Sequence, residues 1–218
     1  MAIAPQIPLE PIPLEPLLAV LDMAGVAVFA VSGALAAARI KQTIVTFAFF
    51  AAITGIGGGT LRDLLIGAPV FWVGRSDYLG ICLVAAASVW LFKADRWRMN
   101  ALLWFDALGL GAYSVLGAAK ALSLGVPPLP SVGMGVLTAS FGGIVRDLLA
   151  GEPSILLRRE IYVSAAALGA GTYVGLTLLG LSLWPAAVIG AAAGFGLRGI
   201  AIATGLALPG YRPEPEGD

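Results

Sequence analysis

The chain contains one glycine-rich motif twice, at a fixed spacing. Residues 57–69 read GGGTLRDLLIGAP, and residues 141–153 read FGGIVRDLLAGEP. Arg62-Asp63 in the first copy is followed 84 positions later by Arg146-Asp147 in the second. Other residues keep this spacing without a gap: Asp22 and Asp106, Gly25 and Gly109, Phe29 and Tyr113, Gly33 and Gly117, Thr54 and Thr138, Arg75 and Arg159, and Tyr78 and Tyr162. Such a long ungapped match predicts two copies of one structural unit.

The composition is that of a membrane protein. Hydrophobic residues make up 59% of the 218 residues and charged residues 12%, whereas soluble domains carry about 25% charged residues. The formal net charge is zero, which gives no basis for nucleic-acid binding. The absence of histidine excludes histidine-based catalysis and histidine metal sites. Neither glycine cluster matches a dinucleotide- or phosphate-binding motif, so we expect no enzyme activity, catalytic residue, metal site or cofactor.

Seven apolar stretches are each about 20 residues long, the length of a helix that spans a bilayer. We expect helices at about 16–38, 43–66, 71–92, 99–122, 131–150, 161–180 and 184–206. The expected organisation is a Pro-rich N-terminal leader (1–15), a first three-helix repeat (16–92), a second one (99–180), a seventh helix (184–206) and a polar C-terminal tail (207–218). Because three is odd, the second unit enters the membrane from the opposite side. The predicted fold class is an all-α integral membrane protein, with an inverted repeat of two three-helix units plus a seventh helix.

Basic residues predict the orientation of these helices. If the N-terminus is outside, the inner loops and tail hold Arg39, Lys41, Lys93, Arg96, Arg98, Arg158, Arg159, Arg198 and Arg212. The outer side then holds only Arg75 as a clear loop charge. Positively charged loops stay on the cytoplasmic side, so we expect the N-terminus outside and the C-terminus in the cytoplasm.

The glycine clusters fall inside the second and fifth predicted helices. Each glycine lowers helix stability by about 1 kcal/mol relative to alanine. Gly57, Gly58 and Gly59 therefore predict a kink or an unwound turn in the second helix, and Gly142 and Gly143 predict one in the fifth. Irregular backbone at membrane depth is tolerated where it is buried or lines water, which favours a break beside a conducting path. Close helix packing through small residues is the alternative.

Arg62, Asp63, Arg146 and Asp147 place charges inside membrane helices, at a cost of about 2.5–3.5 kcal/mol each at the bilayer centre. Adjacent residues point about 100° apart on a helix. We therefore expect each member of an Arg-Asp pair to find its partner elsewhere, at helix ends, unwound carbonyls or other acids. The interior would then be hydrated or mutually paired. Alternatively, each pair lies at the membrane interface, where it snorkels and caps its helix.

Three other polar side chains are candidates for the same interior. Asp22 and Asp106, near the starts of the first and fourth predicted helices, could pair with the arginines or hold a cation, or could cap their helices. Lys120 has no basic counterpart, because position 36 is alanine. It could line a conduit, bind an anionic lipid headgroup or snorkel to the surface.

The motifs at 57–63 and 141–147 resemble the paired glycine-rich motifs of TRIC channels, the trimeric intracellular cation channels. The match is closest to their prokaryotic homologues, whose domain is also described as a glycine transporter. The resemblance covers all seven predicted helices and implies a homotrimer with a pore in every subunit, permeable to K⁺ and also Na⁺. By position, it makes the five glycines the kink residues, and Arg62, Asp63, Arg146 and Asp147 the polar groups beside the pore. Animal members carry a Lys-Glu-Val triplet linked to phosphoinositide binding, whereas here Ala121-Leu122 follows Lys120, so we expect no such regulation.

Three functions are consistent with these residues. In a monovalent cation channel, Asp22, Asp63, Asp106 and Asp147 supply negative potential, and Arg62 or Arg146 gates or pairs with them. In a secondary transporter, an Arg-Asp pair binds a small zwitterion such as glycine. In a membrane scaffold, all the buried charges are structural. The resemblance favours the channel, in a prokaryotic inner (plasma) membrane, with its own copies and membrane lipid as partners and without nucleic acid.

Overall fold

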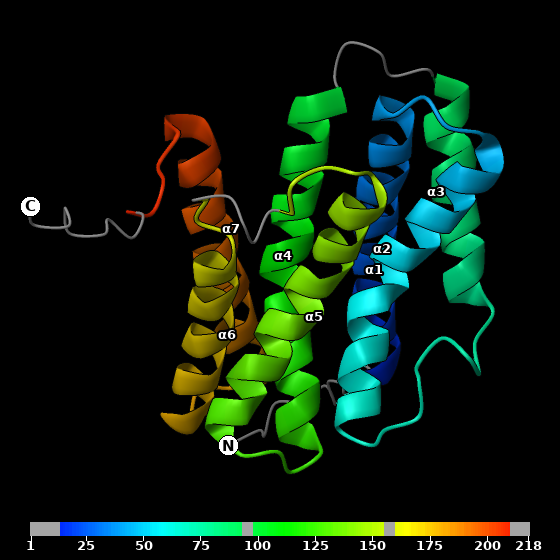
Figure 1. Ribbon diagram of the computed structural model, residues 1–218. Helices are drawn as coiled ribbons and strands as arrows, with labels where there is room; N and C mark the ends of the chain where they lie inside the picture. The colour runs from blue at the N-terminus through cyan, green and yellow to red at the C-terminus, as the bar shows by residue number, and fades with distance from the viewer. Residues whose placement is uncertain (1–13, 93–97, 155–159, 210–218) are drawn as a thin grey trace, which may run out of the picture.

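The computed structural model describes residues 14–92, 98–154 and 160–209. Its helices are α1 (Leu14–Arg39), α2 (Ile44–Leu65), α3 (Asp77–Phe92), α4 (Arg98–Ser123), α5 (Pro128–Leu149), α6 (Val163–Leu178) and α7 (Leu183–Thr204). Figure 1 shows them packed side by side as one bundle. Five of the described helices are long and apolar enough to cross a membrane, whereas α3 and α6 have 16 residues each. The predicted all-α fold is confirmed.

One helix boundary differs clearly from the prediction. α3 begins at Asp77 rather than at residue 71, and the other boundaries differ by at most three residues. The backbone amide of Phe71 donates to Asp63 Oδ2 at 3.0 Å, which folds the segment after α2 back against the end of that helix. An extra turn of α3 would withdraw this amide, so the predicted start at residue 71 is wrong.

α2 and α5 end in the same way, as expected of two copies of one unit. Gly67 and Gly151 follow these helices with φ of 70° and 69°, a left-handed conformation that favours glycine. The next amides, of Ala68 and Glu152, donate to the carbonyl oxygens of Asp63 and Asp147. These contacts form the Schellman motif that closes a helix C-terminus.

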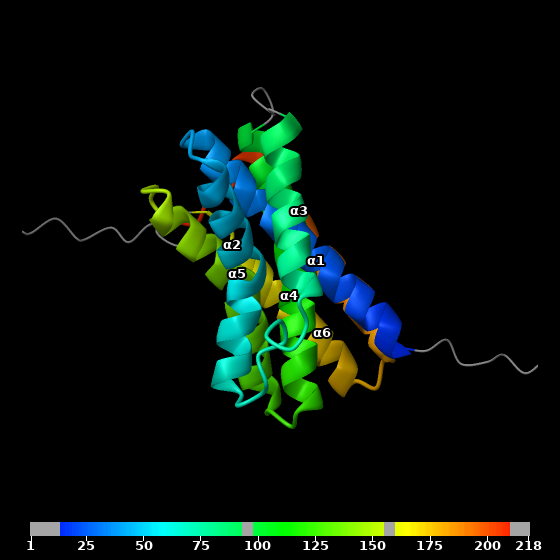
Figure 2. The same ribbon diagram turned by 90° about the vertical axis from the view of Figure 1, so that its right-hand side faces the viewer.

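The two three-helix units are inverted relative to each other. The C-terminal ends of α1, α3 and α5 lie at one end of the bundle, the upper one in Figure 1, which we call the α1–α2 end. The C-terminal ends of α2, α4 and α6 lie at the opposite, α2–α3 end (Figures 1 and 2). α1 packs against α4 and α2 packs against α5, which joins the units, and α7 packs against α4 and α6. α1 and α4 thus run in opposite directions.

α2 and α5 cross through paired glycines. A Cβ atom on Gly58 would lie 2.0 Å from the carbonyl oxygen of Thr138, and one on Gly142 would lie 2.3 Å from that of Thr54. Only glycine lets two helix backbones approach so closely. Both helices nevertheless remain α-helical from end to end. The predicted unwound turn is therefore wrong, because the glycines form a helix contact instead; a bend of the helix axes remains a prediction.

Candidate functional site

Two groups of buried polar residues lie on either side of this crossing. Arg62 follows Gly58 by four residues and Arg146 follows Gly142 by four, which places each arginine about 6 Å along its helix from the crossing. Because α2 and α5 run in opposite directions, the two arginines lie on opposite sides of it. We call the group around Arg62 the first cluster (Asp22, Arg62, Asp63, Tyr78, Tyr113 and Lys120). The group around Arg146 is the second cluster (Ser32, Asp106, Arg146, Asp147 and Tyr162).

Both arginines are inside the protein, and each pairs with its own neighbour. Arg62 and Arg146 are 3% and 1% exposed. Arg62 Nε lies 2.8 Å from Asp63 Oδ1, and Arg146 Nη2 lies 2.9 Å from Asp147 Oδ1. The prediction that neighbouring residues could not pair is wrong, because the long arginine side chain curls around the helix and makes up the angular difference. The alternative, snorkelling to the interface, is also excluded by the burial.

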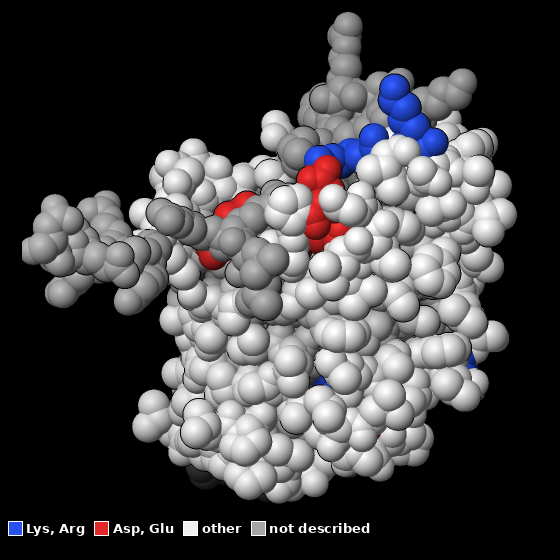
Figure 3. All heavy atoms as spheres, viewed as in Figure 1, with Lys and Arg blue, Asp and Glu red and all other residues white. Residues whose placement is uncertain are grey.

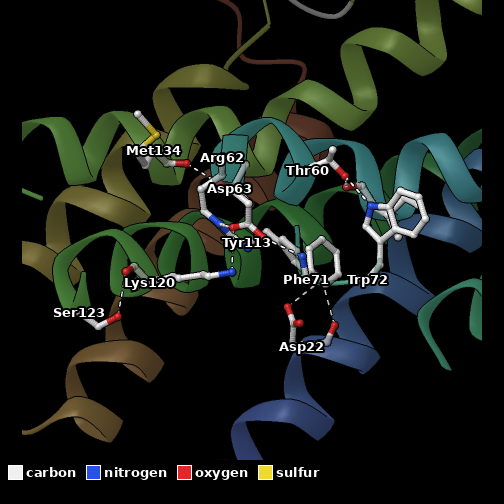
Figure 4. A network of polar contacts seen from close by, with 12 residues as sticks. Asp22, Thr60, Arg62, Asp63, Phe71, Trp72, Tyr113, Lys120, Ser123 and Met134 are labelled. Atoms are coloured by element: carbon white, nitrogen blue, oxygen red, sulfur yellow. Dashed lines mark hydrogen bonds and ion pairs between the residues drawn. The ribbon is translucent and has the colours of Figure 1, made fainter. Parts of the chain in front are cut away.

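Asp63 is the centre of the first cluster, as Figure 4 shows. Its side chain is fully buried and accepts from Arg62, from Lys120 Nζ at 2.8 Å and from the backbone amide of Phe71. The ring of Phe71 covers Gly59, where a Cβ atom would lie 2.6 Å away. A carboxylate with three donors is compensated for its burial. The pairing of Lys120 with Asp63 was not among the roles predicted for this lysine, which also lines the cavity described below.

Asp22 belongs to the same cluster but is not bound to an arginine. Its carboxylate accepts from Tyr78 at 2.7 Å and from Tyr113 at 3.2 Å. Asp22 and Asp106 both lie well within their helices rather than at the N-caps, so the capping alternative is excluded. The two tyrosines were not predicted as site residues, although Tyr78 is matched by Tyr162 at the repeat spacing.

The first cluster borders a cavity of about 370 Å³. Its polar lining comes from Asp22, Arg62, Lys120 and Ser123, while apolar side chains of α4, α6 and α7, including Trp184, form the rest. Lys120 is 32% exposed, so the cavity gives access to a partly solvated ammonium group. The cavity thus joins a polar edge at the first cluster to a larger apolar wall.

The second cluster is sealed by direct ion pairing. Arg146 donates through Nη1 to Asp106 Oδ1 and to Ser32 Oγ, and through Nε to Asp147 Oδ1 at 3.0 Å. The side chains of Arg146 and Asp106 are 1% and 2% exposed. Of the roles left open for these two acids, pairing with an arginine is observed for Asp106, whereas the carboxylate of Asp22 binds two tyrosines instead.

Glycine also shapes the second cluster. A Cβ atom on Gly143 would lie 2.8 Å from the hydroxyl of Tyr162, 3.4 Å from Asp106 Oδ1 and 3.6 Å from Arg146 Nη2. These polar groups thus gather over a surface that only glycine leaves open. Gly57, by contrast, has only Phe141 near it, at 4.0 Å.

Three substitutions between the copies explain why the clusters differ. Lys120 stands opposite Ala36, Tyr113 opposite Phe29 and Ser32 opposite Leu116 at the repeat spacing. Lys120 brings the formal charge of the first cluster to zero, whereas the second cluster has two carboxylates and one guanidinium. Counting only the residues that define each cluster, the first is formally neutral and reaches the protein surface, and the second has one more carboxylate than cations and is closed.

The comparisons with known proteins agree with the repeat. A family model described as "Glycine transporter" matches residues 19–94 and again residues 103–178, which are 84 positions apart. A UPF0126 membrane protein of Vibrio cholerae is 37% identical over 201 residues, 89% of this chain and 83% of its own length. YvgT of Bacillus subtilis is 41% identical over 167 residues (74% and 81%), and the inner membrane protein YadS of Escherichia coli is 37% identical over 155 residues (68% and 73%).

Two solved structures identify the family to which the chain belongs. The TRIC trimeric intracellular cation channel orthologue from Rhodobacter sphaeroides matches with a TM-score of 0.84 and 44% identity, over 87% of this chain and 99% of its own. A prokaryotic TRIC channel crystallised in 0.5 M KCl matches with a TM-score of 0.81 and 27% identity, over 88% and 98%. The chain belongs to the prokaryotic TRIC family. The inverted repeat with a seventh helix, the assignment to a membrane and the expectation of a channel family rather than an enzyme are thereby confirmed.

This TRIC homologue is an integral membrane protein. On the face seen in Figure 3, the visible charged side chains lie mainly near the α1–α2 end, and most of the remaining described surface is uncharged. Large apolar side chains such as Phe49, Leu83 and Val188 are more than half exposed along the helices. Exposed apolar belts of this kind are expected where helices face lipid.

Proposed function

We propose that this TRIC homologue is a channel for K⁺ and Na⁺, with a conducting route inside each subunit of a homotrimer. The observation that carries the proposal is the pair of polar clusters on opposite sides of the α2–α5 crossing, which together hold four carboxylates, with Asp63 and Asp106 fully buried. A cation moving through the subunit would pass Asp22 and Asp63 on one side and Asp106 and Asp147 on the other. Buried carboxylates at membrane depth are typical of cation pathways.

The arginines are compatible with cation passage because they are neutralised. Arg62 contacts Asp63, and Arg146 contacts both Asp106 and Asp147. In this conformation the route is closed at two places: the glycine crossing of α2 and α5, and the sealed second cluster. Opening would require α2 and α5 to separate or bend at Gly57–Gly59 and Gly142–Gly143, while Arg62, Arg146 and Lys120 adjust their partners. These side chains are therefore the proposed gating groups.

The orientation and assembly complete the proposal. Arg39 and Lys41 lie at the α1–α2 end, which we assign to the cytoplasm by the positive-inside rule, with the N-terminus outside. The cavity, which includes Ser123 near the end of α4, then lies in the outer half of the bundle. The relative YadS is an inner membrane protein and the Rhodobacter relative is trimeric, which supports an inner-membrane homotrimer here.

A second candidate function is transport of a small zwitterion such as glycine. The same cavity is lined by the cationic groups of Arg62 and Lys120 and by the carboxylate of Asp22. These charges could bind the carboxylate and the ammonium of one amino acid, and inverted repeats are common in secondary transporters.

Flux measurements on the purified protein in liposomes separate these functions. We expect rapid K⁺ flux that does not saturate at physiological concentrations, with no glycine uptake above protein-free liposomes. The Asp63→Asn variant should reduce the K⁺ flux. Asp77→Asn, which removes a carboxylate at the same end that is 62% exposed, should not. Saturable glycine uptake without K⁺ flux would favour the transporter, and flux of neither would leave a scaffold.

A further inference from the structure

The seventh helix is tied to the second cluster through a buried arginine. Arg198 on α7 is 2% exposed, although its charge was predicted to lie with those of the inner loops and tail. Its Nη2 donates to Glu160 Oε2 at 2.6 Å, and its Nη1 donates to the carbonyl oxygen of Ile161 at 3.3 Å. Its guanidinium lies 5.3 Å from the centre of the Tyr162 ring. One side chain thus holds three consecutive residues at the entry to α6.

A backbone contact strengthens the same connection. Ala207, just after α7, forms an isolated antiparallel bridge with Glu160. α7 and the segment that follows it therefore hold this entry segment at two points. A buried guanidinium that binds a carboxylate through one nitrogen and a carbonyl oxygen through another, and that also lies over an aromatic ring, is better defined in geometry than an exposed ion pair.

Tyr162 carries this connection into the second cluster. Its hydroxyl lies over Gly143, where Asp106 Oδ1 and Arg146 Nη2 also approach. A shift of the Tyr162 ring would therefore disturb the environment of the Asp106–Arg146 pair. Arg198 lies against the Tyr162 ring, so its influence on that pair would run through Tyr162.

The first cluster provides an internal comparison. Tyr78, the counterpart of Tyr162, has the guanidinium of Arg75 over its ring, also at 5.3 Å. Arg75 is 44% exposed and pairs with the nearby Asp77 at 3.5 Å, so it is a local surface contact. Arg198, in contrast, is buried and reaches its tyrosine from a different helix. The cation–ring contact therefore connects two distant segments of the chain at Tyr162 but only neighbouring residues at Tyr78.

We propose that Arg198 is a positioning residue for gating, which holds Tyr162 against the Asp106–Arg146 pair and thereby stabilises the closed state of the second cluster. The proposal rests on the proposed channel function, in which that pair is a barrier. It gives α7, the helix outside the repeat, a specific role: a movement of α7 would pull on the entry to α6 and loosen the barrier.

Single-channel recording of the full-length protein in planar bilayers tests this proposal. Arg198→Gln should raise the open probability by at least about threefold, with unchanged unitary conductance and reversal potential. Arg198→Lys keeps a positive charge for Glu160 but loses the second nitrogen that binds the carbonyl oxygen of Ile161. Its open probability should lie between those of Arg198→Gln and the unsubstituted protein. Arg75→Gln, the matched control at Tyr78, should gate like the unsubstituted protein. A purely structural arginine would lower protein yield and thermal stability without moving the open probability of the surviving channels.

A double-mutant cycle with Tyr162→Phe tests whether the effect runs through the tyrosine. If it does, adding Arg198→Gln to Tyr162→Phe should change the open probability little further. Should Arg198→Gln yield no folded protein, Arg198→Lys enters the same cycle. Unchanged gating in the Arg198 variants, or effects that simply multiply with those of Tyr162→Phe, would overturn this inference alone. Absence of any cation current from the unsubstituted protein would overturn the proposed function together with it.

Discussion

Replacing Gly58 with alanine should destabilise the protein by about 3 kcal/mol or more, at the upper end of what overpacking costs. The new methyl group would lie 2.0 Å from the carbonyl oxygen of Thr138, so α2 and α5 would have to separate. Backbone cannot move aside as a flexible side chain can. Thermal unfolding of the detergent-purified protein, followed by loss of the folded oligomer on size exclusion, would measure the effect.

The neighbouring glycine is the matched control for this change. Gly57→Ala introduces the same methyl group one residue earlier, 4.0 Å from the Phe141 ring, and should be neutral or slightly stabilising because alanine favours helix. Gly142→Ala should resemble Gly58→Ala, since its Cβ would lie 2.3 Å from the carbonyl oxygen of Thr54. Equal effects of Gly57→Ala and Gly58→Ala would show that flexibility of the glycine run, rather than the crossing, is what the fold requires.

Arg146→Ala should cost about 3–5 kcal/mol, because it would leave the carboxylate of Asp106 buried without its cation. Asp106 is 2% exposed, and Asp147 would lose the same partner. Thermal unfolding of the purified variants measures the loss. If the variant is recovered, its gating should change rather than its permeation disappear, since Arg146 is a counter-charge and not a cation ligand.

Arg62→Ala is the comparison that makes this prediction specific. Asp63 would keep Lys120 Nζ at 2.8 Å and the amide of Phe71 at 3.0 Å, and the cavity would admit water. The loss of stability should therefore be clearly smaller than for Arg146→Ala, although the two arginines are counterparts in the repeat. A larger loss for Arg62→Ala would contradict the description of the first cluster as accessible and the second as sealed.

Spacing in the sequence was sufficient to predict the fold. The interval that relates Arg62 to Arg146 also relates the ends of α2 and α5, where Gly67 and Gly151 close both helices with the same motif. Helix lengths and an odd number of helices per unit then led to the inversion. These properties depend on local pattern and on bilayer thickness, both of which a single sequence contains.

The role of the glycines could not be predicted from the sequence alone. Helix propensity describes an isolated helix, and on that basis Gly57–Gly59 should unwind. Whether a glycine breaks a helix or admits a neighbour depends on what lies opposite, and Thr138 is 80 positions from Gly58 in the chain. The packing alternative could be considered, but the contact that favours it becomes visible only in three dimensions.

The remaining wrong predictions concern side chains whose contacts depend on how far they reach and on which helices lie beside them. The angle of about 100° between neighbouring helical residues would prevent Arg62 from pairing with Asp63 only if the arginine side chain extended straight out from the helix. Instead, the side chain bends toward Asp63. Arg198 was counted among the charges of the inner loops and tail although it falls inside the predicted helix 184–206, and the structure buries it within α7. The asymmetry of the clusters was present in the sequence, in Lys120 opposite Ala36, but its consequence depends on Asp63 lying within reach.

The central claim is that a route for cations passes between the two clusters of each subunit. Its most direct test is the reversal potential of currents through the purified full-length protein in a planar bilayer, with different KCl concentrations on the two sides. We predict a reversal potential close to the equilibrium potential of K⁺, because the two clusters together hold four carboxylates against the three cationic groups of Arg62, Lys120 and Arg146. A reversal potential close to that of Cl⁻ would contradict the claim.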